Sequence, residues 1–297
     1  MLPLAPHPNP ATLSKDAFVE KGLVPRRGAM SATSKLIVAL DVPSIDRAIE
    51  IVDATRFYVH SFKIGTALMQ TIIASIIGPR EVRDAEANAG KVRTLFSLLT
   101  GRIFWDAKFS DIPNTVLGSV SEAAAVHPAM VTVHASCGIR SLKAAVAATL
   151  EVVPYGFGGK TMRPKIIAVT VLTSLDDTDT DAIFGGTRKE KVLQFAYNAL
   201  HVGAEGIVCS ASDLSTLRCH NDLTHLLRVV PGVRPQWAPH DDQSAVAIPE
   251  DAVAAGAHFL VVGRPILNPP PAIGTAANAI EDISLAITRG EIRRRSE

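Results

Sequence analysis

Two charged residues, Asp106 and Lys108, stand two positions apart at the end of the apolar run Ile103-Phe-Trp. If this run is a strand, its period of two puts both side chains on one face. Charged side chains are almost never buried without a partner, so this pair needs an ion-pair partner or a ligand. A fixed ammonium group can stabilise a developing negative charge and then donate a proton. Asp106 and Lys108 are therefore the first candidates for catalysis.

Other strand ends carry matching charges. The same alternation places Asp41 and Lys63 at equivalent heights at the ends of two more apolar runs. Asp111 lies three residues beyond Lys108, outside the strand, so it need not share that face and could reach a neighbouring subunit. Taken alone, the pattern D-x-K-x-x-D is weak, and the alternative interpretation is a set of structural ion pairs at a rim. Its place beside two further charged strand ends favours function.

A second group of residues is suited to phosphate. Gly263 and Arg264 follow one predicted strand, and Arg234 follows the preceding one, two residues after Gly232. Arginine donates a fork of hydrogen bonds to phosphate oxygens, and glycine lets a backbone N–H approach closely. A lone arginine at a strand end is more often a surface ion pair, but two on adjacent strands favour a ligand. The loop 236–243 between them is long enough to be a lid.

Short β-branched runs alternate along the chain with longer Ala-rich stretches. The runs predict strands at 36–41, 58–64, 103–108, 130–134, 165–171, 206–209, 227–230 and 259–262. The stretches between them predict helices at 44–54, 66–77, 114–125, 139–150, 188–200, 212–219, 249–255 and 272–287, with Ser44 and Ser212 as N-caps. Residues 78–93 predict an elongated, solvated helix with an insertion.

The alternation is typical of βαβ units and a parallel sheet. Eight repeats in about 260 residues predict a single-domain (β/α)₈ barrel, whose functional groups lie at the C-terminal ends of the strands and whose phosphate sites follow strands seven and eight. The alternative is an open, doubly wound sheet. It is disfavoured because the first strand–helix turn, residues 40–44, has no Gly-rich dinucleotide fingerprint.

Composition excludes several classes of protein. The 297 residues carry a formal net charge of +1, so no overall field favours nucleic acid or an anionic membrane surface. No apolar run approaches the length of a membrane span. Three cysteines without a C-x-x-C pair argue against a disulfide framework and a thiolate zinc site, and favour the cytoplasm. We expect a soluble enzyme with a small substrate, with residues 35–297 forming the barrel after a poorly ordered extension, 1–34.

Three remaining features predict no chemistry. His134 ends a predicted strand without a partner at metal-ligand spacing, so we interpret it as structural. Cys209 is predicted to be a small buried residue. The acidic segment 176–181 lacks the Gly and Glu of a calcium-binding loop and is predicted to be a solvated turn.

The segment Asp106-Ala-Lys-Phe-Ser-Asp-Ile-Pro-Asn-Thr115 resembles the D-x-K-x-x-D-I-P-N-T signature of the orotidine 5′-phosphate decarboxylase family. Further matching motifs follow in family order at Leu40–Val42, Phe62–Gly65, Val133–Ser136, Thr170–Ser174, Gly206–Ser210, Val230–Pro235, Asp241–Gln243 and Val261–Ile266. The resemblance implies a metal-free and cofactor-free (β/α)₈ barrel. It also implies a homodimer that converts orotidine 5′-monophosphate into UMP, the last step of de novo pyrimidine biosynthesis.

The same resemblance implies roles for the charged residues. Lys63, Asp106, Lys108 and Asp111 would form an alternating array, with Asp111 supplied by the partner subunit. Lys108 would stabilise the carbanion at C6 of the pyrimidine and then protonate it. Asp106 would orient this lysine. Asp41 and Lys63 would bind the ribose hydroxyls.

Further residues would hold the rest of the nucleotide. The resemblance implies that Thr173 reads the pyrimidine edge, that Thr115 adds a contact across the dimer, and that Gln243 bridges phosphate and base. Arg234, Gly263 and Arg264 would bind the phosphate.

Two alternatives stay open at this point. A magnesium-dependent 3-keto-L-gulonate 6-phosphate decarboxylase or hexulose-phosphate synthase shares D-x-K-x-x-D but needs an acidic ligand set for its metal. The I-P-N-T that follows Asp111, together with Thr173 and Gln243, fits a pyrimidine nucleotide better. A non-catalytic nucleotide-binding barrel is disfavoured because every charged member of the array is present.

Overall fold

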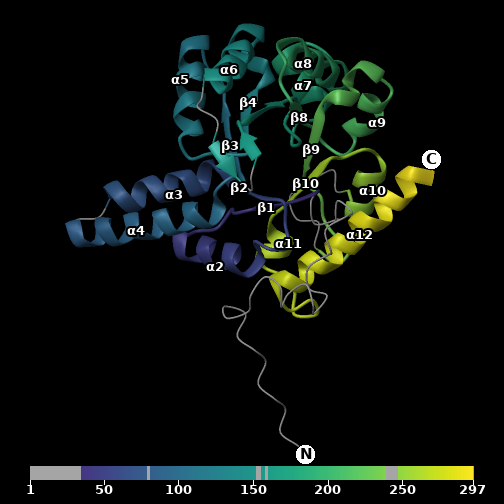
Figure 1. Cartoon of the computed structure of the whole chain (residues 1–297). Coiled ribbons are helices and arrows are strands. Elements are labelled where there is room, and N and C mark those ends of the chain that lie inside the picture. Colours follow the sequence, from purple (N-terminus) through teal and green to yellow (C-terminus); the bar gives the residue numbers. More distant parts are fainter. Residues whose placement is uncertain (1–34, 79–80, 152–154, 158–159, 239–246, 297) are drawn as a thin grey trace, which may run out of the picture.

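The protein folds as a closed barrel of eight parallel strands surrounded by helices (Figure 1). This computed structural model describes residues 35–78, 81–151, 155–157, 160–238 and 247–296. The predicted extension 1–34 lies outside the described residues. Among those that are described, no helix is long and apolar enough to cross a membrane.

The barrel strands are those that the sequence predicts, with small differences at their ends. They are β1 Leu36–Ala39, β2 Ser61–Gly65, β3 Ile103–Phe109, β4 Met130–His134, β7 Lys165–Val169, β8 Gly206–Val208, β9 Leu227–Pro231 and β10 Phe259–Val262. They pair in the order β1-β10-β9-β8-β7-β4-β3-β2, and β1 closes the barrel by pairing with both β2 and β10. This closure confirms the (β/α)₈ barrel and excludes the open, doubly wound alternative.

Helices follow the strands and form the outer layer. They are α2 Ile45–Thr55, α3 Thr66–Ile77, α4 Val82–Leu99, α5 Pro113–Ala124, α6 Ile139–Glu151, α7 Asp177–Phe184, α8 Arg188–Val202, α9 Asp213–Arg218, α10 Pro249–Ala254, α11 Arg264–Leu267 and α12 Ala276–Ser296. Two short 3₁₀ helices, η3 Ala135–Cys137 and η4 Asn221–His225, and a small hairpin of β5 Tyr155–Phe157 with β6 Lys160–Met162 complete the order. Sequence patterns did not predict this hairpin.

Both serines predicted as N-caps directly precede their helices, but only Ser44 makes a side-chain capping bond. The Ser44 hydroxyl accepts a hydrogen bond from the backbone N–H of Arg47 at 3.2 Å and so begins α2. Ser212 makes no such bond, because its hydroxyl pairs with that of Ser210 at 2.7 Å. The carboxylate of Asp213 accepts the N–H of Ser210 instead.

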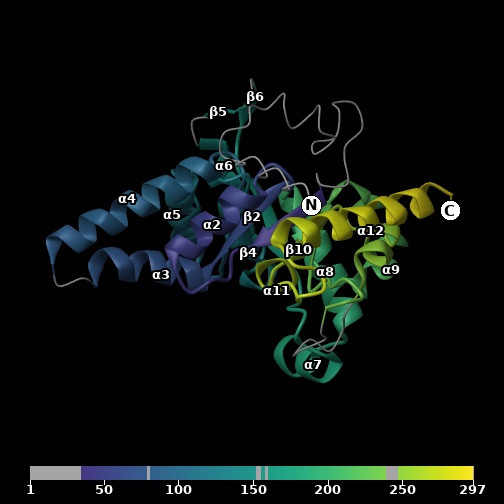
Figure 2. The ribbon, with the colours of Figure 1, turned by 90° about the horizontal axis from the view of Figure 1, so that it is seen from below.

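The prediction of a solvated turn at 176–181 is wrong. Residues Asp177–Phe184 form α7, which begins with Asp176 accepting the N–H of Asp179 at 2.8 Å and ends at Gly185 in the left-handed conformation. Several aspartates in the first turn suit the positive end of a helix dipole. The acidic run that argued for a turn is therefore a helix start, and Figure 2 shows α7 projecting from the barrel.

The predicted insertion forms a helical hairpin. Helices α3 and α4 lie side by side and extend away from the barrel in Figures 1 and 2. The Asn88 amide donates to the carbonyl of Ser75 at 2.8 Å and joins the two helices. A helix in this region is confirmed, but it spans Val82–Leu99 rather than 78–93.

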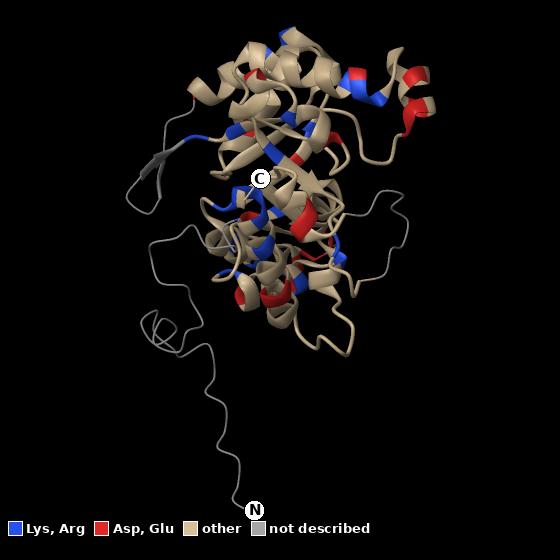
Figure 3. Cartoon of the chain, turned by 90° about the vertical axis from the view of Figure 1, so that its right-hand side faces the viewer, with Lys and Arg blue, Asp and Glu red and all other residues tan. Residues whose placement is uncertain are grey.

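The core has two layers, as expected for side chains that alternate along barrel strands. Inside the barrel, a small cluster includes Ile37, Phe104, Met130 and Ile167. Outward-facing strand residues pack with the helices in a much larger cluster. On the surface, acidic and basic residues are interspersed over the side that Figure 3 shows, in keeping with the net charge of +1.

Candidate active site

A cavity of about 420 Å³ lies at the C-terminal ends of the strands, which is the end where barrel enzymes place their functional groups. Its size is within the range of small-molecule sites. The predicted site residues that line it are Asp41, Lys63, Asp106, Lys108, Thr173, Arg234, Gly263 and Arg264. The structure thus brings together eight predicted site residues that are spread from position 41 to position 264 of the sequence.

Four of these residues form a chain of alternating charge. The Lys63 Nζ lies 3.0 Å from Asp41 Oδ1 and 3.6 Å from Asp106 Oδ2. The Lys108 Nζ lies 2.7 Å from the same Asp106 oxygen. Asp106 is nearly buried, with 8% of its side chain exposed, whereas 36% of the Lys108 side chain is exposed toward the mouth. The carboxylate of Asp106 therefore holds two ammonium groups that line the cavity, of which that of Lys108 belongs to the more exposed side chain.

The backbone at Lys108 departs from a regular strand. Its φ is 52°, in a region that residues other than glycine seldom occupy, and the pairing of β3 with β4 shifts between Trp105 and Phe109. The Lys108 N–H donates to the Thr132 hydroxyl at 2.8 Å, and this hydroxyl donates to Asp106 Oδ1 at 3.0 Å. Sequence reasoning missed both the irregular strand and Thr132. The signal for Thr132 was a polar residue in the middle of an apolar strand.

Gly65 leaves space for the Lys63 ammonium group. A Cβ atom at this position would lie 2.8 Å from Lys63 Nζ and 3.3 Å from Asp41 Oδ1. Real Cβ atoms do not approach so closely, and therefore any larger residue would displace the lysine. The glycine that ends β2 thus leaves room for the Lys63 ammonium in its observed position.

The predicted phosphate residues line the same cavity, after β9 and β10. Arg234 follows β9 and is 4% exposed, while Arg264 begins α11 directly after Gly263. A Cβ at Gly263 would press on Ala39 at 3.3 Å. Two guanidinium groups and a closely approaching backbone suit an anion.

The predicted lid is described only in part. Gln243 lies outside the described residues, so its predicted contact with phosphate and base stays a prediction. At the start of the loop, the Trp237 indole N–H donates to Asp282 in α12 at 2.8 Å. This bond ties the beginning of the loop to the outer helices.

Asp111 and Thr115 lie apart from this cavity. Asp111 lines a separate, open hollow of about 850 Å³, where its carboxylate accepts the N–H of Ile112 at 2.7 Å and its carbonyl accepts the Ser141 hydroxyl at 2.8 Å. Thr115 is exposed on α5. Ile112 is 66% exposed and Ile139, across the hollow, is 43% exposed. Within one chain, these two predicted residues do not join the array.

Comparisons with known proteins agree with this geometry. The sequence profile of the "Orotidine 5′-phosphate decarboxylase / HUMPS family" matches residues 34–279. A curated relative from Marinomonas sp. (strain MWYL1), named orotidine 5′-phosphate decarboxylase, is 38% identical over 84% of this chain and 97% of its own length. A relative of the same name from Heliobacterium modesticaldum is 35% identical over 88% of this chain and 100% of its own.

The chain belongs to this decarboxylase family.

A solved structure of a protein with this name has a similar fold. The crystal structure of orotidine 5′-phosphate decarboxylase from Lactobacillus acidophilus is 28% identical, with a TM-score of 0.65, and the match covers 85% of this chain and 98% of that one. Three of the relatives match over nearly their whole length, and each is named orotidine 5′-phosphate decarboxylase, which is the name of an enzyme. The protein is accordingly an enzyme of this family.

His134, which we interpreted from the sequence as a structural residue, stands near the charge array and is influenced by both Lys108 and Asp106. Burial lowers the pKa of its imidazole, the positive charge of Lys108 lowers it further, and the negative charge of Asp106 opposes them. The surroundings at the end of β4 thus favour the neutral form of this imidazole. Across the described residues, no three His, Cys, Asp or Glu side chains are grouped to hold a metal ion.

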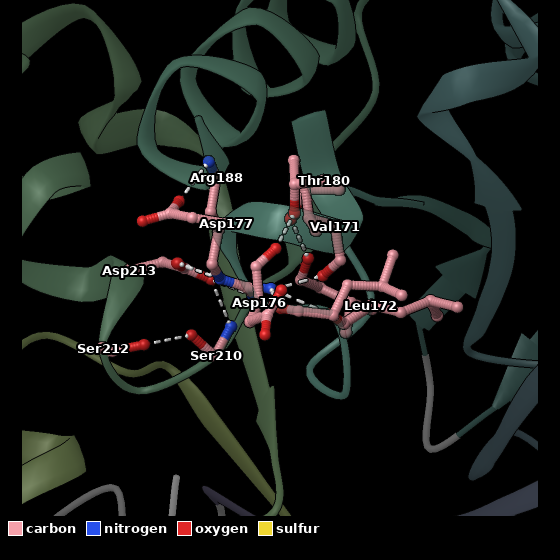
Figure 4. A network of polar contacts seen from close by, with 12 residues as sticks. Val171, Leu172, Asp176, Asp177, Thr180, Arg188, Ser210, Ser212 and Asp213 are labelled. Carbon is pink, nitrogen blue, oxygen red and sulfur yellow. Dashed lines mark hydrogen bonds and ion pairs between the residues drawn. The ribbon is translucent and has the colours of Figure 1, made fainter. Parts of the chain in front are cut away.

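A buried ion pair supports the loop that carries Thr173, and sequence reasoning missed it (Figure 4). The Arg188 Nε and Nη2 donate to the two carboxylate oxygens of Asp213 at 3.0 and 2.9 Å. The Arg188 Nη1 donates to the carbonyls of Leu172 and Leu175 at 2.8 and 2.9 Å. Because the pair joins residues 25 apart, at the starts of α8 and α9, local patterns carry no signal for it. The bonds to Leu172 and Leu175 hold the backbone on either side of Thr173, which lines the cavity.

Proposed function

We propose that the protein decarboxylates orotidine 5′-monophosphate to UMP, the last step of de novo pyrimidine biosynthesis, without a cofactor. The observation that carries this proposal is the Lys108 ammonium at the mouth, 2.7 Å from a nearly buried carboxylate and exposed to a nucleotide-sized cavity. Loss of CO₂ from C6 leaves an electron pair in an sp² orbital with little delocalisation. A fixed cation beside C6 compensates for this missing delocalisation.

Lys108 has two tasks in the proposed reaction. Its ammonium group first stabilises the negative charge that grows at C6 as the bond to the carboxylate breaks. It then donates a proton to the same carbon, which gives UMP. Asp106 keeps the ammonium in place, and Lys63 with Asp41 binds the ribose hydroxyls. The ammonium is in position before the substrate arrives, so no reorganisation is needed during the reaction.

The remaining cavity residues bind the parts of the substrate that do not react. Arg234, Arg264 and the backbone at Gly263 suit the 5′-phosphate, and Thr173 suits the pyrimidine edge. Binding energy at the phosphate can hold the loops closed over the base, so remote contacts contribute to the rate.

The proposed active unit is a homodimer. Asp111 is exposed on a hollow that is rimmed by apolar side chains, and it takes no part in the array of its own chain. We propose that this face packs on a second copy, where Asp111 completes the partner's array and Thr115 contacts the partner's ribose. A test mixes Lys108→Ala and Asp111→Ala subunits, each inactive alone. Recovery of about one active site per mixed dimer is expected, and no recovery contradicts the shared site.

One assay tests the reaction. Purified protein is incubated with orotidine 5′-monophosphate and EDTA, and the ultraviolet absorbance of the pyrimidine is followed as UMP forms. Turnover in EDTA is expected. No turnover with or without magnesium contradicts the proposal, and turnover that EDTA abolishes contradicts its metal-free mechanism.

A further inference from the structure

Thr132 is a fully buried hydroxyl next to the proposed catalytic lysine. It lies in β4 with none of its surface exposed, and it does not line the cavity. Its neighbours in the strand, Val131 and Val133, face the outer core. Thr132 therefore points into the barrel, and a buried hydroxyl there costs free energy unless it is hydrogen-bonded.

The pairing of β3 with β4 explains its partners. Trp105 pairs with Val131 and Phe109 pairs with Val133, so three residues of β3 stand opposite the single residue Thr132. This irregularity removes the ladder partner of the Lys108 N–H, and the Thr132 hydroxyl accepts it at 2.8 Å instead.

The same hydroxyl closes a ring of hydrogen bonds. Its proton goes to Asp106 Oδ1 at 3.0 Å, and the other oxygen of Asp106 accepts from Lys108 Nζ at 2.7 Å. The ring thus holds Lys108 at both ends, at its backbone N–H and at its ammonium. It also holds the backbone at a φ of 52°, a conformation that persists only when the surroundings determine it.

We propose that Thr132 is a positioning residue that fixes the Lys108 ammonium over the substrate by bonding both the lysine backbone and the Asp106 carboxylate. This inference rests on the proposed function. Thr132 touches no substrate, so its hydroxyl affects the rate of the bound complex more than the binding of the nucleotide. A small displacement of a reacting group is sufficient for a large loss of rate.

The test compares three variants. Thr132→Val keeps the branched shape and removes the hydroxyl, while Thr132→Ser keeps the hydroxyl. Thr55→Val is the matched control, because Thr55 is equally buried and donates to the Ile51 carbonyl in α2. The readouts are kcat and KM for orotidine 5′-monophosphate, and the Kd of UMP by calorimetry.

Thr132→Val is expected to lower kcat about 10- to 100-fold, the usual effect of losing a hydrogen bond to a charged group, with the Kd of UMP within about 3-fold of wild type. Thr132→Ser is expected to recover most of kcat, and Thr55→Val to keep it within about 2-fold. A kcat for Thr132→Val within about 3-fold of wild type overturns the inference, and so does an equal loss for Thr132→Ser. Should the valine variant not fold, Thr132→Cys replaces it, since a thiol is a weak hydrogen-bonding group.

A crystal structure of the wild type and of Thr132→Val separates this inference from the proposed function. Lys108 is expected to leave its positive φ, or its Nζ to leave Asp106, in the valine variant. An unchanged Lys108 overturns the positioning role even if the enzyme is active. If the wild type does not decarboxylate the nucleotide, the proposed function fails, whatever the crystal structures show of the lysine.

Discussion

At the mouth of the barrel, Lys63 and Lys108 are held by the carboxylates of Asp41 and Asp106, whereas at the opposite end Arg102 is held by backbone carbonyls. Arg102 directly precedes β3, and its guanidinium group donates to the carbonyls of Arg56, Val59 and His60. Both ends therefore carry cations in a largely buried setting. Of these three cations, Lys63 and Lys108 have carboxylate partners and line a cavity, whereas Arg102 has neither among the described residues.

The difference separates structural charges from those available for chemistry. Backbone carbonyls satisfy the donors of Arg102 but bring no negative charge, so burial followed by the charge of Arg56 lowers the pKa of this guanidinium. Burial also lowers the pKa of His60 to about 4, with smaller contributions from Arg102 and Lys165. At the closed end, the surroundings thus favour the uncharged form of His60, and they bond Arg102 through carbonyls rather than carboxylates. The mouth keeps formal charges beside one another, which is costly unless a ligand uses them.

The strongest test of the comparison removes the cation at the mouth. Lys108→Ala is expected to lower kcat at least about 10⁴-fold, because it removes both the electrostatic stabilisation and the proton donor. The Kd of UMP, measured by calorimetry, should change less than about 10-fold. Activity that survives in the alanine variant would contradict the assignment of Lys108.

Removing the cation at the closed end should have the opposite profile. Arg102→Ala is expected to lower the free energy of unfolding by about 2 to 4 kcal/mol, because three carbonyl partners lose a charged donor. Its kcat should stay within about 3-fold of wild type. The control is Arg83→Ala, whose side chain is 86% exposed and whose removal should cost less than about 0.5 kcal/mol. Urea unfolding measures both, and a large fall in kcat for Arg102→Ala would break the comparison.

Acid should weaken the closed end through His60. The pKa of this imidazole is about 4 in the folded protein against 6.5 for the free group, so the unfolded chain binds the proton more tightly. The stability that it contributes is fully present above pH 6.5 and is lost as the pH falls toward 4. Much of the His60 side chain is exposed to solvent, which screens its charge, so we expect a loss of less than about 1 kcal/mol by pH 4.5 from this group. Unfolding curves of His60→Gln should show a shallower dependence on pH between 6.5 and 4.5, with the exposed His201→Gln as the control; identical slopes would contradict the expectation.

The smallest effect is predicted at Gly65. A methyl group there would displace the Lys63 ammonium, whose flexible stem can move aside, so Gly65→Ala is expected to raise KM about 3- to 10-fold with little change in stability. Gly90→Ala is the matched control, because a Cβ at Gly90 meets no atom within 4 Å and an alanine suits the middle of α4. Steady-state kinetics distinguish the two variants. An unchanged KM for Gly65→Ala would contradict the expectation that the position of the Lys63 ammonium matters for substrate binding.

Much of the barrel and its mouth could be predicted from sequence. The β-branched runs identified every barrel strand, because strand patterns are local. The C-terminal ends of parallel strands then meet at one end of the barrel. The charged residues of the cavity could be predicted from their places at strand ends and from the resemblance to the decarboxylase family; they are Asp41, Lys63, Asp106, Lys108, Arg234 and Arg264. The acidic run at 176–181 was misinterpreted because aspartates favour turns and helix starts alike. The cytoplasmic location and the absence of cofactors and nucleic-acid partners stay predictions.

By itself, the sequence determined which residues stand at the strand ends and that their charges alternate between neighbouring strands. Only the tertiary structure decided how Lys108 is held: the pairing of β3 with β4 leaves its N–H to Thr132, 24 residues away. It also decided that Arg188 pairs with Asp213 beneath the loop of Thr173. The physical reason is the same in both cases. Both contacts join residues far apart in the sequence, across the paired strands β3 and β4 in one case and between the starts of α8 and α9 in the other. They are therefore settled when the barrel closes rather than by any local pattern.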